Sequence, residues 1–195
     1  MPDVPNATKS YLIPIGDLTL ADRAEIRANV QKLLESNALN LAIRPSIGDM
    51  IIRDTLPFTD LAIPGVGGVV PEESWLIPGP GIVGTELQYF SNAIAQSRIV
   101  SFFGVGVESA AASISVIRLT LGPASRTSRA VFQLDPLYSR LEPAGYFSSP
   151  VVFTRTETCR TMVMPRIAFA VNTERLHLLA RTIEPIGDIV SAPSV

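Results

Sequence analysis

The stretch TMVMPRIAFAVNTERLHLLARTI, residues 161–183, decides the fold of this chain. Two apolar runs rich in β-branched residues flank a short polar break at residues 172–174, which is the pattern of a β-hairpin. Pairing about that break places His177 opposite Ala168. Both faces of the first run are largely apolar, so we expect a strand covered on both sides, inside a sandwich or barrel or against a neighbouring subunit. Pro165 removes one ladder donor and favours an edge or a bulge, where a partner chain can dock.

The rest of the second half repeats this β pattern in short apolar runs separated by turn residues. We expect further strands at residues 98–107, 113–121, 128–134 and 151–156. The sequence therefore predicts a mainly β protein, an antiparallel β-sandwich or barrel of seven or eight strands. We expect it to be jelly-roll-like, with an N-terminal extended arm and one or two short helices.

The first half divides into an arm and the start of the main domain. Residues 1–18 contain several prolines and predict an extended arm, while residues 19–195 form a single β-rich domain. A helix is expected at about residues 20–36, because apolar side chains recur there at helical spacing. Thr19 is its expected N-cap, and Asn37 is its expected end.

Two further segments of the first half are less regular. Residues 39–84 are rich in proline and glycine and predict long apolar loops that wrap over the β core or lie along a neighbour. Residues 85–96 have apolar side chains at helical spacing after Thr85, so we expect a second, short helix there.

The composition bears on the class of function. Hydrophobic residues make up 47% of the chain and charged residues 17%, with a mean hydropathy of +0.31. This balance favours an oligomer that buries much of its exterior, although a well-packed β domain with long apolar loops explains it equally. The net charge of −2 gives no global basic field for nucleic acid or anionic lipid. We also expect no membrane span and recognise no secretory signal.

The motifs that could carry chemistry are weak. Gly104-Val105-Gly106 follows an apolar run, but the third small residue and the later acidic residue of a dinucleotide fingerprint are missing, so we expect these glycines to bend or bulge a strand. His177 stands between two leucines and predicts a half-buried structural histidine, far along the ladder from Cys159. One histidine and one cysteine make a metal centre improbable. The chain is accordingly not expected to be an enzyme or to hold a cofactor or a metal.

Charged side chains offer two weaker possibilities. Glu72 and Glu73 are adjacent on a loop and are expected to be solvated rather than catalytic. Several arginines of the second half could bind phosphate or a partner's carboxylates if they shared one face. They are Arg126, Arg129, Arg140, Arg155 and Arg160.

These observations predict a structural, self-assembling subunit, above all a virion component of the capsid, coat or cement type that forms a homo-oligomeric shell or ring. Its partners would be copies of itself and other structural subunits, without sequence-specific nucleic-acid binding, in a virion or other large assembly and otherwise in the cytoplasm. A tail-associated or adhesion protein that forms a small closed ring is a variant of this class. The expected interface residues are apolar ones on the arm, the loops and the last strands: Tyr11, Leu12, Ile13, Leu56, Phe58, Trp75, Leu76, Ile77, Met162 and Met164.

The alternative belongs to a different class. A β-barrel ligand-binding module or small enzyme would have an arginine-lined pocket that also includes Phe102, Phe103 and Trp75.

Overall fold

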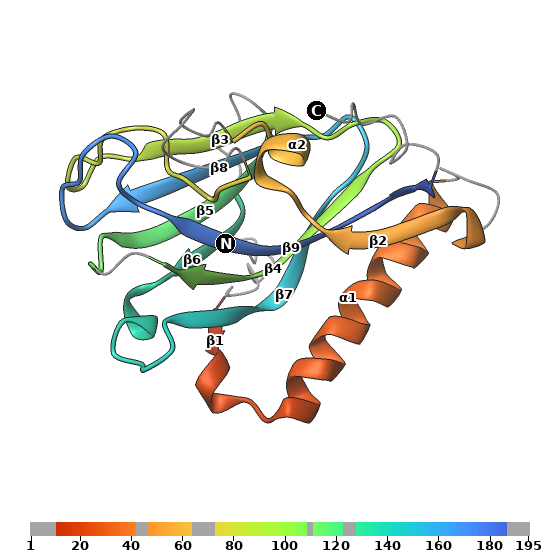
Figure 1. Ribbon diagram of the computed structural model, residues 1–195, viewed down its shortest axis with the longest axis horizontal. Helices are drawn as coiled ribbons and strands as arrows, with labels where there is room; N and C mark the ends of the chain where they lie inside the picture. The colour runs from red at the N-terminus through yellow and green to blue at the C-terminus, as the bar shows by residue number, and fades with distance from the viewer. Residues whose placement is uncertain (1–10, 42–46, 64–72, 109–110, 123–127, 187–195) are drawn as a thin grey trace, which may run out of the picture.

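Two antiparallel β-sheets pack face to face in the computed structural model, which describes residues 11–41, 47–63, 73–108, 111–122 and 128–186 (Figure 1). The larger sheet has the strand order β1 (Leu12–Pro14), β7 (Ala144–Phe153), β4 (Ile99–Val107), β9 (Leu176–Pro185) and β2 (Met50–Asp54). The smaller sheet has the order β3 (Leu87–Ala93), β8 (Thr158–Pro165), β5 (Ile114–Leu121) and β6 (Ser128–Gln133). The predicted mainly β, two-sheet sandwich is confirmed, and its jelly-roll character stays a prediction.

The main core lies between the two sheets. Alternate residues of β9, namely Leu176, Leu178 and Ala180, point into it and are buried. The rings of Phe132 from β6 and Phe147 from β7 stack across the interface with their centroids 3.8 Å apart. The alternation of inward and outward side chains along strands such as β9 therefore produces the sandwich interior.

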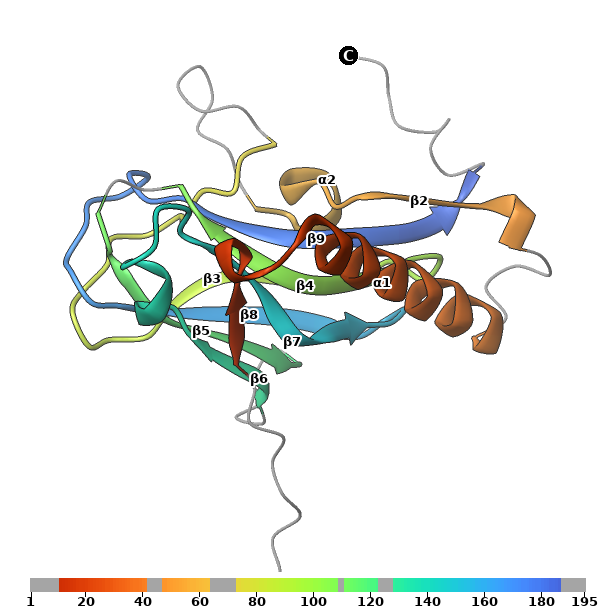
Figure 2. The same cartoon turned by 90° about the horizontal axis from the view of Figure 1, so that it is seen from below.

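Helix α1 (Leu20–Asn40) covers part of the outer face of the larger sheet (Figure 2). It begins at the predicted N-cap, where Thr19 and Asp22 form a capping box. It extends beyond the predicted end to Asn40, and the Asn37 side-chain amide donates to the Leu33 carbonyl at 2.8 Å within the helix. Its buried residues Val30, Leu34 and Ala38 pack on side chains such as Phe103, Tyr146 and Ile183 and form a second core.

The predicted hairpin between the last two strands is wrong. β8 pairs with β3 and β5 in one sheet, whereas β9 pairs with β4 and β2 in the other. A turn does occur at the polar break, where Asn172 has a φ of 60°, but the segment after Pro165 crosses from one sheet to the other. His177 consequently lies opposite Gly106 of β4 rather than Ala168.

The predicted helix at residues 85–96 is also wrong, because β3 occupies this segment. Its Tyr89 and Phe90 are buried, and β3 pairs with β8 through a register shift between Gln88 and Phe90. Pairing at the edge of the sheet overrides the helical spacing of the apolar residues. The second helix is instead the short α2 (Pro57–Leu61), inside the segment predicted to be loop.

The other predicted strands occur with shifted boundaries, and the described residues contain nine strands where seven or eight were predicted. β4, β5 and β6 match the predicted strands, whereas β7 begins at Ala144, ahead of residue 151. The register of β4 shifts between Phe102 and Gly104, so the pairing is irregular next to this glycine, where a bend or bulge was predicted. Residues 12–14 of the predicted arm form β1 at the edge of the larger sheet, and residues 1–10 lie outside the described part of the chain.

Candidate functional site

A cleft of about 530 Å³ lies on the part of the larger sheet that α1 leaves open. Its floor is the outer face of β9 with Phe103 of β4 beside it, and Leu179 points outward between His177 and Arg181. Arg27 of α1 forms one wall. The other walls are the connection from β2 to α2 and the segment that contains Trp75. The volume falls within the range of small-molecule sites.

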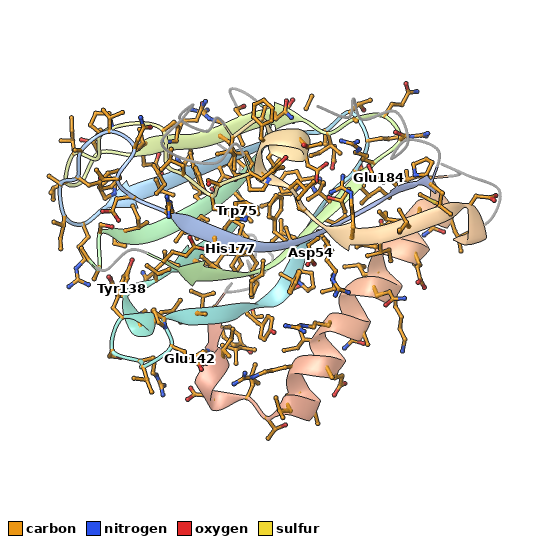
Figure 3. All side chains as sticks on the ribbon, viewed as in Figure 1. Asp54, Trp75, Tyr138, Glu142, His177 and Glu184 are labelled. Carbon is orange, nitrogen blue, oxygen red and sulfur yellow. The ribbon has the colours of Figure 1, made fainter. Side chains whose placement is uncertain are left out.

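Trp75 and His177 form the aromatic side of the cleft. Their rings stack with centroids 5.3 Å apart and an interplanar angle of 20° (Figure 3). His177 Nδ1 lies 3.1 Å from a carboxylate oxygen of Glu108, and the His177 side chain is 42% exposed. The histidine is therefore half-exposed and is oriented by Trp75 and Glu108. The ring edge away from Nδ1 remains available to a ligand in the cleft.

The charged side chains of the cleft differ in how many hydrogen bonds and ion pairs they make. Arg181 lies 3.6 Å from Asp54, whose side chain is 87% exposed, so this ion pair is weak. Glu73 accepts hydrogen bonds from the backbone N–H groups of Phe58 and Thr59, which ties its charge to the start of α2. Arg27 is exposed and has no hydrogen-bonding or ionic partner among the residues that the structure describes.

A buried ionic cluster adjoins one end of the cleft. It consists of Arg53, Asp60, Arg98 and Glu184, and the carboxylates of Asp60 and Glu184 are 0% and 1% exposed. Two Arg53 nitrogens lie 2.7 and 2.8 Å from the Asp60 oxygens, and Arg98 Nε lies 2.6 Å from Glu184. The hydrogen bond to Asp60 raises the pKa of Arg53 above its usual value. The cluster joins β2, α2, β9 and the start of β4, which is a structural role.

At the opposite end of β9, two loops form an exposed apolar surface. The segment that follows Trp75 runs antiparallel to the β8–β9 connection, with bridges between Leu76 and Arg175 and between Gly81 and Phe169 (left side of Figure 1). Ile82 and Val83 are 64% and 58% exposed on the first segment, and Ile167 and Val171 are 47% and 53% exposed on the second. We call these four residues the apolar tip. The Phe169 ring packs so closely on Gly81 that a Cβ there would lie 2.2 Å from it. The two loops are therefore closely packed against each other at this point.

The structure separates the predicted interface residues into three groups by their exposure. Trp75, Leu76, Ile77 and Met162 are at most 8% exposed and pack within the chain itself. Exposed surface is found on Tyr11, Leu56 and Phe58, at 61%, 39% and 45%. The remaining three, Leu12, Ile13 and Met164, are intermediate in exposure.

The other predicted groups are dispersed. Arg129 pairs with Glu157 at 2.6 Å and Arg140 with Asp17 at 2.8 Å, so these arginines do not form a shared anion site. Arg126 and Glu72 lie outside the described residues. Cys159 is fully buried, and burial raises the pKa of its thiol, so it is not poised as a nucleophile.

The pocket of the alternative prediction exists in part. Trp75 and Phe103 line the cleft, but Phe102 points into the main core, and the arginines are Arg27, Arg175 and Arg181. Sequence reasoning missed these three because they come from a helix, a loop and a strand. The alternation of His177, Leu179 and Arg181 was a usable signal for an outward strand face with polar side chains.

Comparison of the chain with protein families, with curated proteins and with solved structures found no match. Within the described residues, no helix is long and apolar enough to cross a membrane. The same residues contain no group of three or more histidine, cysteine, aspartate or glutamate side chains placed to hold a metal ion.

Proposed function

We propose that this protein is a structural subunit that assembles with copies of itself, of the kind that builds a virion shell or ring as a capsid, coat or cement protein. The observation that supports this proposal is the apolar tip. Four aliphatic side chains, each at least 47% exposed, gather on two hydrogen-bonded loops. Exposed apolar side chains gathered on one part of a protein are typical of an interaction site.

The partner that fits the apolar tip is a second copy of the chain. Residues 78–85 and 167–173 contain no charged side chain, and the flanking Glu86 and Arg166 are paired within the chain, so a mainly apolar surface is complementary to the tip. The tip of a second copy meets that requirement, and a two-fold axis through such a patch gives a closed, self-complementary contact. The virion setting is supported by analogy alone, because β-sandwich subunits with apolar loops are suited to shells.

The test is the mass of the purified, untagged protein by light scattering behind size exclusion, with the same peak viewed by negative-stain microscopy. We expect a closed oligomer, ring or particle. Ile167→Glu should shift this peak to the monomer mass, because a charge would be buried without a partner in the contact. The side chain is already 47% exposed in the single chain, so the substitution leaves the fold intact.

The matched control is Leu20→Glu, which places the same charge on a side chain that is 82% exposed at the start of α1. This variant should assemble like the natural protein. A stable monomer of the natural protein at micromolar concentration contradicts the proposal, as does an Ile167→Glu variant that assembles unchanged.

A further inference from the structure

The cleft beside β9 is separate from the apolar tip, since none of the four tip residues lines it. A ligand of the cleft would therefore be different from the partner that covers the apolar tip. The cleft combines an apolar floor at Leu179, an aromatic side at Trp75 and His177, and guanidinium groups from α1 and β9. Such a combination of apolar walls and a few convergent polar groups is typical of a site for a small organic ligand.

The cleft is lined by three arginines and three carboxylates, so an anion is favoured by how these groups are engaged and not by their net charge. Of its three carboxylates, Glu73 is bonded to α2, Glu108 to His177, and Asp54 points into solvent. Arg27 has no partner among the described residues, and Arg181 has only the weak pair with Asp54. These two guanidinium groups can therefore donate hydrogen bonds to an oxyanion, in the bidentate manner that carboxylates and phosphates allow.

Besides the charged groups that bind an anionic head, the cleft offers an apolar floor for the rest of a ligand. Leu179 is half-buried, and its side chain lies over Gly104, where a Cβ would come within 2.8 Å of it. Phe103 and Tyr146 stack beneath with their centroids 6.0 Å apart, which makes this part of the floor rigid. A flat apolar group can pack on this surface beside the stacked Trp75 and His177.

We propose that the cleft binds a small organic anion whose carboxylate or phosphate head lies between Arg27 and Arg181 and whose apolar body lies on Leu179. Glu35, on the same helix as Arg27, forms no ion pair with either arginine within the described residues, and its carboxylate accepts a hydrogen bond from Gln31 at 2.9 Å. His177 supplies an additional hydrogen-bonding edge, oriented by Glu108.

The experiment is an NMR titration of the ¹⁵N-labelled full chain with phenylacetate, phenyl phosphate and the neutral 2-phenylethanol. For ligands of this size we expect the preferred anion to bind with a Kd of about 1 mM, and 2-phenylethanol to bind at least about tenfold more weakly. The shifted amides should include those of His177, Leu179 and Arg181. The ratio of the two anion affinities shows which head group the site prefers.

Matched charge removals on α1 distinguish this site from general electrostatics. Arg27→Gln should weaken both anions roughly tenfold, since it removes a charged hydrogen-bond donor from the head group. Lys32→Gln removes one positive charge from an exposed position of the same helix outside the cleft and should leave both affinities unchanged.

Several results would overturn the proposal. These are equal binding of 2-phenylethanol and the anions, shifts centred on the apolar tip, an Arg27→Gln variant with natural affinity, or no saturable shift below about 20 mM ligand. The assembly proposal is unaffected by any of them, because the titration can be run on the monomeric Ile167→Glu variant.

Discussion

Cys159 of β8 shows how one buried side chain makes the stability of the whole fold depend on pH. Its thiol is fully buried in the main core, and this burial raises its pKa above the ordinary value of 9.0. In the unfolded chain the thiol loses its proton near pH 9, whereas in the folded chain it keeps it. The contribution of the Cys159 thiol to folding stability is therefore fully present below that pH and is lost progressively as the pH rises above it.

We predict that Cys159→Val loses less stability than the natural protein when the pH is raised. The thiol should account for about 1.4 kcal/mol of the free energy of unfolding lost between about pH 8 and about pH 10. Urea unfolding at both pH values measures this difference. Tyr89, whose pKa burial also raises, contributes equally to both proteins and cancels. Parallel losses in the two proteins would show that Cys159 is accessible to solvent in the fold.

Single residues were predictable where a local rule decides them. Thr19 caps α1 as expected, because a side-chain oxygen placed before a helix bonds the free N–H of its first turn. The role of His177 was predictable only in part. Its position between two buried leucines shows that it faces outward from β9, but its contacts with Trp75 and Glu108 depend on residues about 70 to 100 positions earlier in the chain.

At the scale of elements, the ionic cluster joins β2, α2, β9 and β4 through four side chains. Removing one charge leaves both arginines with a single carboxylate in a largely buried site. We predict that Glu184→Gln lowers the free energy of unfolding by about 3 kcal/mol, because breaking a buried ion pair leaves charge uncompensated. Chemical denaturation at neutral pH measures this loss.

The control for that experiment is an exposed ion pair. Asp135 lies 3.0 Å from Arg166, and both side chains are about half exposed, at 53% and 48%. Asp135→Asn should change the free energy of unfolding by less than about 1 kcal/mol. Similar losses in Asp135→Asn and Glu184→Gln would show that water screens the cluster as it screens the surface.

The elements also show why a correct pattern can give a wrong partner. The two apolar runs around residues 172–174 are strands, and the turn between them exists, yet β8 and β9 belong to different sheets. A hairpin and a crossing between sheets have the same alternation in sequence, because both join two strands through a polar turn. The difference is set by which neighbours each strand finds, and those neighbours come from distant segments.

The whole molecule consists of two cores that share the larger sheet. The main core lies between the sheets, and the smaller core lies between α1 and the opposite face of β4 and β9. Composition alone predicted an apolar chain with little charge, but not that α1 would cover only part of the sheet. That partial cover, which leaves room for the cleft, follows from the packing angle of the helix and has no signal in the helix sequence.

This arrangement predicts unequal local stability. Three residues of the 21-residue α1 are buried, whereas seven of the nine residues of β4 are buried and β4 is paired on both sides. Amides of α1 should therefore exchange with solvent through local openings that leave β4 intact. Val30→Ala removes about 1.6 kcal/mol of apolar contact from the smaller core, so hydrogen–deuterium exchange in α1 should rise roughly tenfold.

The comparison with β8 makes this prediction specific. β8 lies in the smaller sheet, on the far side of the main core from α1, so in the natural protein its amides should need a larger opening free energy to exchange than those of α1. If the helix instead unfolded only together with both sheets, the amides of α1, β4 and β8 would exchange with one common opening free energy in the natural protein. Peptide-resolved mass spectrometry separates the two outcomes, because a local opening exposes the amides of one segment, whereas global unfolding exposes the amides of all segments.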